Sequence, residues 1–230
     1  MPTTATRRFR FKGPEMEGAV ARWYARLRST DSQLEVYRQE AQKLTAGLAD
    51  GAQVLEVAPG PGHLAIAMAR SGRLHVTGLD ISRTFVDIAS QNAREAGVTA
   101  DFRQGDAAQL PFDADRFDLI VCQAAFKNFN QPQLALSEMH RVLRPGGTAV
   151  IKDMSHEATH ESIDREVGGM SLGRVSRFTT RATLEMLRRR AYSTSQFERL
   201  VAQSPFRGCE ISVEGIGLEV RMKKLEAAVA

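Results

Sequence analysis

This sequence has few cysteines and no long apolar runs, which argues against a disulfide-rich protein and against a membrane-spanning one. Cys122 and Cys209 are the only cysteines, which argues against a disulfide framework or a cysteine metal site. No run approaches the roughly twenty apolar residues of a membrane-spanning helix. The basic start of the chain is not followed by an apolar segment, so it does not fit a secretory signal. We therefore expect no membrane association and a reducing, cytoplasmic location.

Internal repeats and low-complexity linkers are also lacking, so nothing divides the 230 residues. A composition that is 43% hydrophobic and 25% charged can bury one large core, and we predict a single domain over 1–230. The net charge of +4 comes partly from basic clusters at 7–12 and 174–190. Such clusters either attract anions or form solvated helix faces, and nucleic acid is not a favoured partner.

Apolar segments alternate with segments of helical periodicity through the middle of the chain. Strands are expected at 52–58, 73–80, 98–106, 116–123 and 148–154, and helices at 63–71, 82–97 and 131–143. Two helices are expected before them, at 15–28 and 33–48, the second capped by Asp31 or Ser32. Further helices at 180–191 and 193–204, the latter with a capping-box pattern at Ser193 and Gln196, precede a hairpin that turns at Gly215.

This alternation predicts an α/β fold, a doubly wound, seven-stranded, mostly parallel sheet of the Rossmann-like kind. N-terminal helices precede the sheet, and a helical insertion separates its fifth strand from the C-terminal β-hairpin. Ligands of such sheets bind at the carboxyl ends of the strands, where the strand order reverses.

A loop rich in glycine and proline, "EVAPGPG" at 56–62, follows the first expected strand. Its small residues let the backbone approach a ligand closely, but Gly60 and Gly62 alone would also fit a dinucleotide fingerprint. Asp80 ends the second expected strand, where a carboxylate can accept from ribose hydroxyls, and Asp106 ends the third. Both aspartates could instead cap turns, and Glu56 could be a buried acid satisfied by backbone amides.

Four segments in this order, "VLEVAPGPG", "GLD", "GDAAQLPF" and "RVLRPGG", resemble the class I S-adenosylmethionine-dependent methyltransferases, specifically the methyltransferase type 11 group. The resemblance covers about residues 33 to 153. It implies S-adenosyl-L-methionine as cofactor and S-adenosyl-L-homocysteine as product. It also divides the domain into a helical cap (1–50), a cofactor-binding core (51–153), an acceptor-side insertion (154–206) and a terminal hairpin (207–223).

The resemblance assigns cofactor contacts by position. The loop residues line the methionine part, Asp80 the ribose, Asp106 and Ala107 the adenine, and Gln123 lies near the sulfonium. Ile81 is a further cofactor-binding residue. The loop residues in question are Glu56, Ala58, Pro59, Gly60 and Gly62. The family usually has glycine where this chain has Ala58, and we expect binding to be retained with a loop that the flanking prolines stiffen.

The methyl acceptor is expected to contact the variable segments. Trp23 and Tyr24 could close over the cofactor or stack on the acceptor, or simply pack within their helix. Phe126, Lys127 and Asn128 follow the fourth expected strand, where related enzymes place acceptor-orienting groups. Lys127 could bind an anionic acceptor or be solvated.

His156-Glu157-Ala158-Thr159-His160 matches the H-E-x-x-H motif of zinc proteases. The extended form of that motif needs glycine and histidine at positions that here hold Ile163 and Glu166, so a metal site is not expected. Because the segment follows the fifth expected strand, His156 could act as a general base for the acceptor. The alternatives are a surface helix with i,i+4 pairs and an adventitious metal site.

The sequence therefore predicts S-adenosylmethionine-dependent methyl transfer to a small-molecule acceptor. The segments "NPPY" and "DPPY", typical of enzymes that methylate exocyclic or side-chain amines in DNA and proteins, do not occur. Two alternatives remain: an RNA or protein methyltransferase that uses the arginine-rich insertion, and a cofactor-binding protein that does not methylate. The acceptor atom and the oligomeric state are left open.

Overall fold

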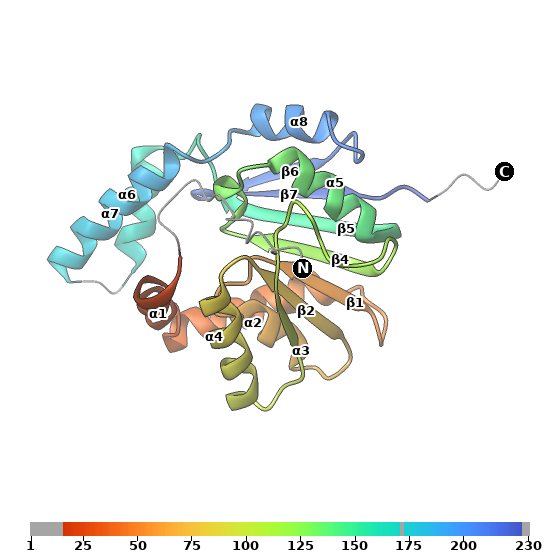
Figure 1. Cartoon of the computed structure of the whole chain (residues 1–230). Helices are drawn as coiled ribbons and strands as arrows, with labels where there is room; N and C mark the ends of the chain where they lie inside the picture. The colour runs from red at the N-terminus through yellow and green to blue at the C-terminus, as the bar shows by residue number, and fades with distance from the viewer. Residues whose placement is uncertain (1–15, 171–172, 227–230) are drawn as a thin grey trace, which may run out of the picture.

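Seven strands form one sheet in the order β3-β2-β1-β4-β5-β7-β6, with helices on both faces (Figure 1). The computed structural model describes residues 16–170 and 173–226, so the basic cluster at 7–12 lies outside the described residues. Five strands run parallel, and β7 is antiparallel to both β5 and β6. This is the predicted fold class. The strands are β1 (Gln53–Val57), β2 (His75–Asp80), β3 (Asp101–Gln104), β4 (Phe117–Gln123), β5 (Leu143–Met154), β6 (Glu210–Glu214) and β7 (Gly217–Lys223).

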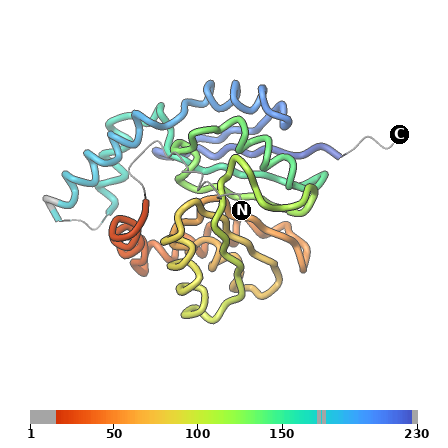
Figure 2. Tube along the Cα trace, in the orientation of Figure 1, coloured from red at the N-terminus to blue at the C-terminus, as the bar shows by residue number. Residues whose placement is uncertain are grey.

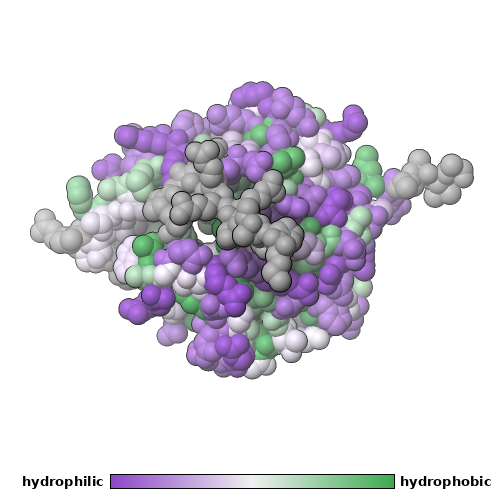
Figure 3. Space-filling view, viewed as in Figure 1, coloured by the Kyte–Doolittle hydropathy of each residue, from purple (hydrophilic) through white to green (hydrophobic). Residues whose placement is uncertain are grey.

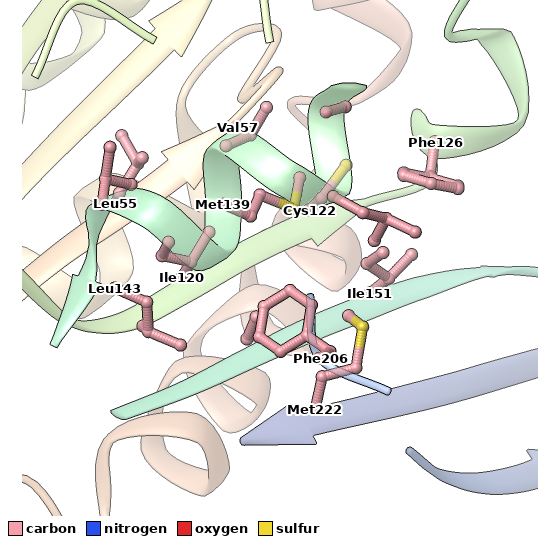
Figure 4. Packing of buried hydrophobic residues seen from close by; sticks show 14 of the residues in the cluster. Leu55, Val57, Ile120, Cys122, Phe126, Met139, Leu143, Ile151, Phe206 and Met222 are labelled. Atoms are coloured by element: carbon pink, nitrogen blue, oxygen red, sulfur yellow. The ribbon is translucent and has the colours of Figure 1, made fainter. Parts of the chain in front are cut away.

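Helices cover both faces of the sheet, and further helices lie at one end of it (Figure 1). They are α1 (Gly18–Leu27), α2 (Asp31–Thr45), α3 (His63–Ala69), α4 (Arg83–Glu95), α5 (Pro132–Val142), α6 (His160–Gly169), α7 (Arg174–Arg188) and α8 (Thr194–Ala202), with a 3-10 turn η1 (Phe126–Asn128). Buried residues of α2, α3 and α4 share one core with β1 and β2. Those of α5 and α8 share another with β4, β5 and β7, part of which Figure 4 shows. Burial on both faces explains why the strands are nearly continuous apolar runs.

The segment between β5 and β6 has a small core of its own. Met154, Ile163, Val167 and Ala191 are buried together, and Leu184 and Leu187 of α7 pack against them. Helices α6 and α7 lie side by side at one end of the sheet, next to α1 (Figures 1 and 2). The insertion therefore places an extra helical wall beside the strand ends.

Local capping signals mostly predict the element ends. The Ser82 hydroxyl accepts from the Phe85 amide at the start of α4, the Ser193–Gln196 capping box is present, and Gly215 turns the hairpin with φ of +58°. The predicted cap of α2 is wrong: the helix begins at Asp31, so Thr30 is its N-cap and makes no side-chain cap.

Two strand predictions need correction. The third strand ends at Gln104, and Asp106 lies beyond it in a tight turn with a bridge to Gln109. The expected turn at 144–147 lies inside the span of β5, where the register with β4 shifts and Gly146 takes a φ of +80°. Within the described ranges, no helix is long and apolar enough to cross a membrane.

Candidate active site

A cavity of about 2280 Å³ opens along the carboxyl ends of β1, β2, β4 and β5. The strand order reverses between β1 and β4, which is where open α/β sheets bind ligands. Typical small-molecule pockets measure about 300–1,000 Å³, so this cavity has room for a cofactor and a second molecule together. The loop after β1 and the end of β2 line one part of the cavity, and α1 and α7 line another.

The loop after β1 has an unusual backbone. Ala58, Gly60 and Gly62 all have positive φ, at +57°, +53° and +80°. Ala58 adopts the conformation that glycine takes more easily, at a strain of about 1–2 kcal/mol, and its amide donates to the Leu79 carbonyl at 2.8 Å. The departure from glycine at this position thus leaves the loop shape intact. Pro59 and Gly60 also line the cavity, whereas Gly62 lies behind it.

Gly62 packs against the next layer of the protein. A Cβ added to it would lie 2.8 Å from Ala89 Cβ and 2.9 Å from Phe102 Cζ. Both distances are shorter than side chains tolerate, so only glycine fits between α4 and β3.

Asp80 ties this loop to the end of β2. Its Oδ2 accepts from the Gly60 amide at 2.9 Å, and its Oδ1 accepts from the Ser82 amide at 2.9 Å. Burial raises the pKa of the Asp80 carboxyl despite these hydrogen bonds. Asp80 therefore caps the turn and also lines the cavity with Ile81. A carboxylate oxygen accepts more than one hydrogen bond, so turn capping and ribose binding are compatible.

Glu56 and Gln123 present buried oxygens that no described residue satisfies. Glu56 is 3% exposed with Oε2 unpartnered, and Gln123 Oε1 is also without a donor. Burial, with a contribution from the nearby Asp80 charge, raises the pKa of Glu56 to about 8. Because a buried polar atom without a partner costs about 1–3 kcal/mol, both atoms are placed for donors of a ligand.

Asp106 and Ala107 line the cavity beyond β3. Asp106 Oδ1 accepts from the Ala108 amide at 2.9 Å, so it caps its own turn as the alternative interpretation predicted. Among the described residues, none donates to its Oδ2, which leaves that oxygen for an exocyclic amine.

Arg28, Tyr37 and His63 also line the cavity, although no sequence pattern indicates them. Arg28 Nη2 donates to the Tyr37 hydroxyl at 2.9 Å, and the Tyr37 and His63 rings lie 5.7 Å apart. They come from the end of α1, from α2 and from the start of α3. Their meeting depends on how α1 and α2 dock against the sheet, which helical periodicity does not reveal.

Among the predicted acceptor residues, Trp23, Tyr24, Lys127 and Asn128 line the cavity. Tyr24 also packs edge-on against Phe85, with ring centroids 5.9 Å apart. The assignment of Phe126 needs correction: it is fully buried in the core between β4 and α8 (Figure 4), so it supports the acceptor side from beneath.

Lys127 is neither solvated nor free for an anionic acceptor. Its ammonium lies 2.6 Å from Asp153 Oδ1 and donates to the Ala124 carbonyl at 2.6 Å. The backbone amide of Lys127 donates to the other Asp153 oxygen at 3.0 Å. The residue therefore pins the turn after β4 to the end of β5.

The structure does not support a base role for His156. Helix α6 begins at His160, so His156 lies in the preceding turn and the two histidines do not share a helix face. The His156 ring is exposed, its Nδ1 lies 3.0 Å from the Arg188 carbonyl, and it does not line the cavity. His160 pairs with Glu185 of α7. The segment therefore fastens α6 and α7 together.

Fold and site together define a cofactor-binding domain of the doubly wound class, with one cavity at the switch point. The family model described as a methyltransferase domain matches residues 55–151. Over these residues the chain matches the class I S-adenosyl-L-methionine-dependent methyltransferases, a family that uses S-adenosyl-L-methionine as cofactor. The unpartnered Glu56 and Gln123 oxygens fit such a cofactor, because they offer acceptors to its polar groups.

Curated relatives match this part of the chain. A demethylmenaquinone methyltransferase of Deinococcus radiodurans is 35% identical over 108 residues, covering 46% of this chain and 45% of that protein. A ubiquinone/menaquinone biosynthesis C-methyltransferase of Rhizobium meliloti is 34% identical over 130 residues, covering 55% and 50%. The chain therefore spans about half the length of the curated relatives that it matches.

Solved structures share the fold over most of the chain. A Methanococcus maripaludis protein described as a candidate S-adenosyl-L-methionine-dependent methyltransferase has a TM-score of 0.76 at 20% identity, covering 96% of this chain and 100% of that one. The [4+2]-cyclase SpnF has a TM-score of 0.55 at 19% identity, covering 85% and 82%. At these identities the likeness concerns the fold alone.

Proposed function

We propose that this chain transfers a methyl group from S-adenosyl-L-methionine to a small organic acceptor with a sizeable apolar part, in the cytoplasm. One observation carries the proposal. One cavity is lined both by the family's cofactor motifs and by apolar side chains of α1 and α7.

Several large apolar side chains that line the cavity are exposed, although apolar side chains of this size are usually buried. Trp23, Leu27 and Met186 are 60%, 50% and 55% exposed, and all three line the cavity. Hydrophobic residues are visible on the side of the molecule where α1 and α7 lie (Figure 3). Exposed apolar surface gathered around one cavity is typical of a ligand-binding site.

When bound, S-adenosyl-L-methionine supplies an electrophilic methyl group on a sulfonium. The residues of this chain then have to align the acceptor and exclude water. The Lys127–Asp153 pair fixes the turn that carries Asn128 into the cavity, and α1 and α7 cover the apolar part of the acceptor. Gln123, at the end of β4, also lines this cavity.

The names of the curated relatives indicate which acceptors to try first. They refer to demethylmenaquinone and to ubiquinone or menaquinone biosynthesis, and such quinones carry a ring with an apolar chain. The apolar side chains that line the cavity support an acceptor of this chemistry, and we propose a reduced quinone precursor as the first candidate.

The arginine-rich insertion supports the RNA or protein alternative only weakly. Arg181 pairs with Asp164, Arg188 with Glu185, and Arg165 with Glu161. These carboxylates reduce the positive field that binding to phosphate groups needs.

The test is methyl transfer from S-adenosyl-L-methionine labelled in its methyl group. Purified protein is incubated with a reduced demethylated quinone, with bulk RNA and with a protein extract, in separate reactions. Label in the organic extract is expected, and Trp23→Ala should lower it while leaving S-adenosyl-L-homocysteine affinity unchanged. Label in RNA or protein alone would overturn the proposal, and so would cofactor binding without transfer to any of the acceptors.

A further inference from the structure

Arg28 is a largely enclosed cation without a carboxylate. Among the described residues, none of the ion pairs within 4.0 Å includes it. Its Nη2 donates to the Tyr37 hydroxyl at 2.9 Å, but its Nε is buried and has no partner. Buried charges are normally paired, because an unpaired one loses its hydration without compensation. The guanidinium is therefore suited to bind an anion.

Aromatic rings hold the guanidinium in place. Its central carbon lies 6.0 Å from the Tyr24 ring centroid and 5.8 Å from the Tyr37 ring centroid. A cation over two aromatic rings is stabilised by their quadrupoles and keeps its orientation. Arg28 thus presents fixed donors to the cavity that it lines.

The contacts of His63 show that the Arg28 side chain lies near the loop after β1. His63 directly follows Gly62, its ring lies 5.7 Å from that of Tyr37, and its Nε2 is buried without a partner. Burial, with a contribution from the Arg28 charge, lowers the pKa of His63. The Arg28 guanidinium is therefore linked through Tyr37 to the start of α3, directly after the loop that carries the cofactor motif.

A complementary acid lies in the same region. Glu56, at the floor of the loop, has an unpartnered Oε2, and its charge contributes to raising the pKa of Tyr37. An unpaired cation and an unpaired acid thus lie in one part of one cavity. Their natural ligand is a zwitterion with a carboxylate and an ammonium group.

We propose that Arg28 binds the carboxylate at the methionine end of the cofactor, with Tyr37 orienting the guanidinium and His63 offering a further hydrogen bond, while Glu56 binds the ammonium. This inference rests on the proposed function, because it concerns the cofactor of that reaction. It makes the end of α1 part of the cofactor site, although the family model begins only at residue 55.

Two ligands that differ only at this end test the assignment. S-adenosyl-L-homocysteine has the carboxylate and the ammonium, whereas 5′-methylthioadenosine has neither. Arg28→Met keeps the length of the side chain and removes its charge. It should weaken S-adenosyl-L-homocysteine about 10- to 100-fold in calorimetric titration, the range for losing a hydrogen bond to a charged group. The affinity for 5′-methylthioadenosine should change by less than about twofold.

Controls separate binding from folding. Arg22→Met, on the exposed side of the same helix and outside the cavity, should leave both affinities unchanged. Arg28→Lys should restore part of the S-adenosyl-L-homocysteine affinity, because it returns the charge without the planar donors. Tyr37→Phe should lower that affinity alone, by a smaller factor.

The outcomes distinguish this inference from the proposed function. If the unaltered protein binds neither ligand, the cofactor assignment fails and this inference fails with it. If it binds S-adenosyl-L-homocysteine and Arg28→Met weakens both ligands equally, Arg28 has only a structural role and the inference is overturned. Unchanged S-adenosyl-L-homocysteine affinity in that variant would also overturn it, and the methyltransferase proposal would stand.

Discussion

The Lys127 ammonium and the Asp153 carboxylate form an ion pair of 2.6 Å in which the two side chains are only 5% and 1% exposed. Asp153 Oδ1 also accepts from the Met154 amide at 2.8 Å, so the acid organises the end of β5 as well as the turn after β4. A buried ion pair contributes little net free energy to stability, but removal of one partner is costly because the other charge stays buried and unpaired.

We expect Lys127→Met to lower the free energy of unfolding by about 3–5 kcal/mol at neutral pH, because Asp153 would remain buried without its counter-charge. Urea denaturation gives the difference directly. The matched control is Arg38→Met, which breaks an exposed pair with Glu35 and should cost less than about 1 kcal/mol. Equal losses in the two variants would contradict the importance of burial.

Gly62 and Gly51 form a second matched comparison, because their φ angles are +80° and +82°. A Cβ at Gly51 would meet nothing within 4 Å, whereas one at Gly62 would clash with Ala89 and Phe102. We expect Gly51→Ala to cost about 1 kcal/mol of backbone strain, and Gly62→Ala to cost a further 1–3 kcal/mol of overpacking. Thermal unfolding of both variants tests this, and similar melting temperatures would contradict it.

Glu56 should release a proton when the cofactor binds. Its pKa of about 8 keeps the carboxyl protonated at pH 7 in the ligand-free protein. A bound ammonium favours the carboxylate, so the affinity for S-adenosyl-L-homocysteine should rise with pH up to about 8. Calorimetry in buffers of different ionisation enthalpy should detect roughly one proton released per molecule bound near pH 6.5, and none for Glu56→Gln.

The same shift affects the ligand-free fold with a definite sign. Because the pKa of Glu56 is higher in the folded state than its ordinary value of 4.5, its contribution to the free energy of unfolding is complete below pH 4.5. That contribution is lost as pH rises toward about 8. Glu56→Gln should remove this part of the pH dependence, and an unchanged profile would argue against the raised pKa.

His156→Ala should change the rate of methyl transfer by less than about threefold, because the ring lies outside the cavity and faces the Arg188 carbonyl. Removal of a general base costs about 10²–10⁴ in rate, so the two possibilities are well separated. Initial rates at saturating cofactor give the answer. A loss of a hundredfold or more would restore the base assignment.

The sequence predicts the sheet and the cofactor loop well, because both depend on local signals. These signals involve only residues close together in the chain: the apolar runs, the small residues at 58–62 and Asp80 at the end of its strand. Gly62 and Asp80 therefore take up positions that a linear motif describes. The predicted end of the third strand at Asp106 was wrong by two residues, because the turn there is held by the aspartate's own carboxylate.

The remaining site residues depend on contacts between distant segments. Arg28, Tyr37 and His63 meet only because α2 docks on α3 while α1 packs against α4, and no spacing in the sequence encodes that docking. Phe126 was predicted on the acceptor side but is buried in the core, whereas Lys127 does line the cavity but is paired with Asp153. The H-E-x-x-H segment was misleading because a motif of histidines four apart has meaning only on a helix, and here the helix starts at the second histidine.

The position of β7 between β5 and β6 also bears on how the molecule folds. Strands β1 to β5 can pair as the chain is made, but β5 gains its outer neighbour only when Thr148 meets Lys223, after α6, α7 and α8 have been passed. Until then β5 has an open hydrogen-bonding edge, which is a template for wrong pairing between molecules. The cofactor half can thus assemble early, while closure of the acceptor half waits for a late pairing between segments distant in the chain.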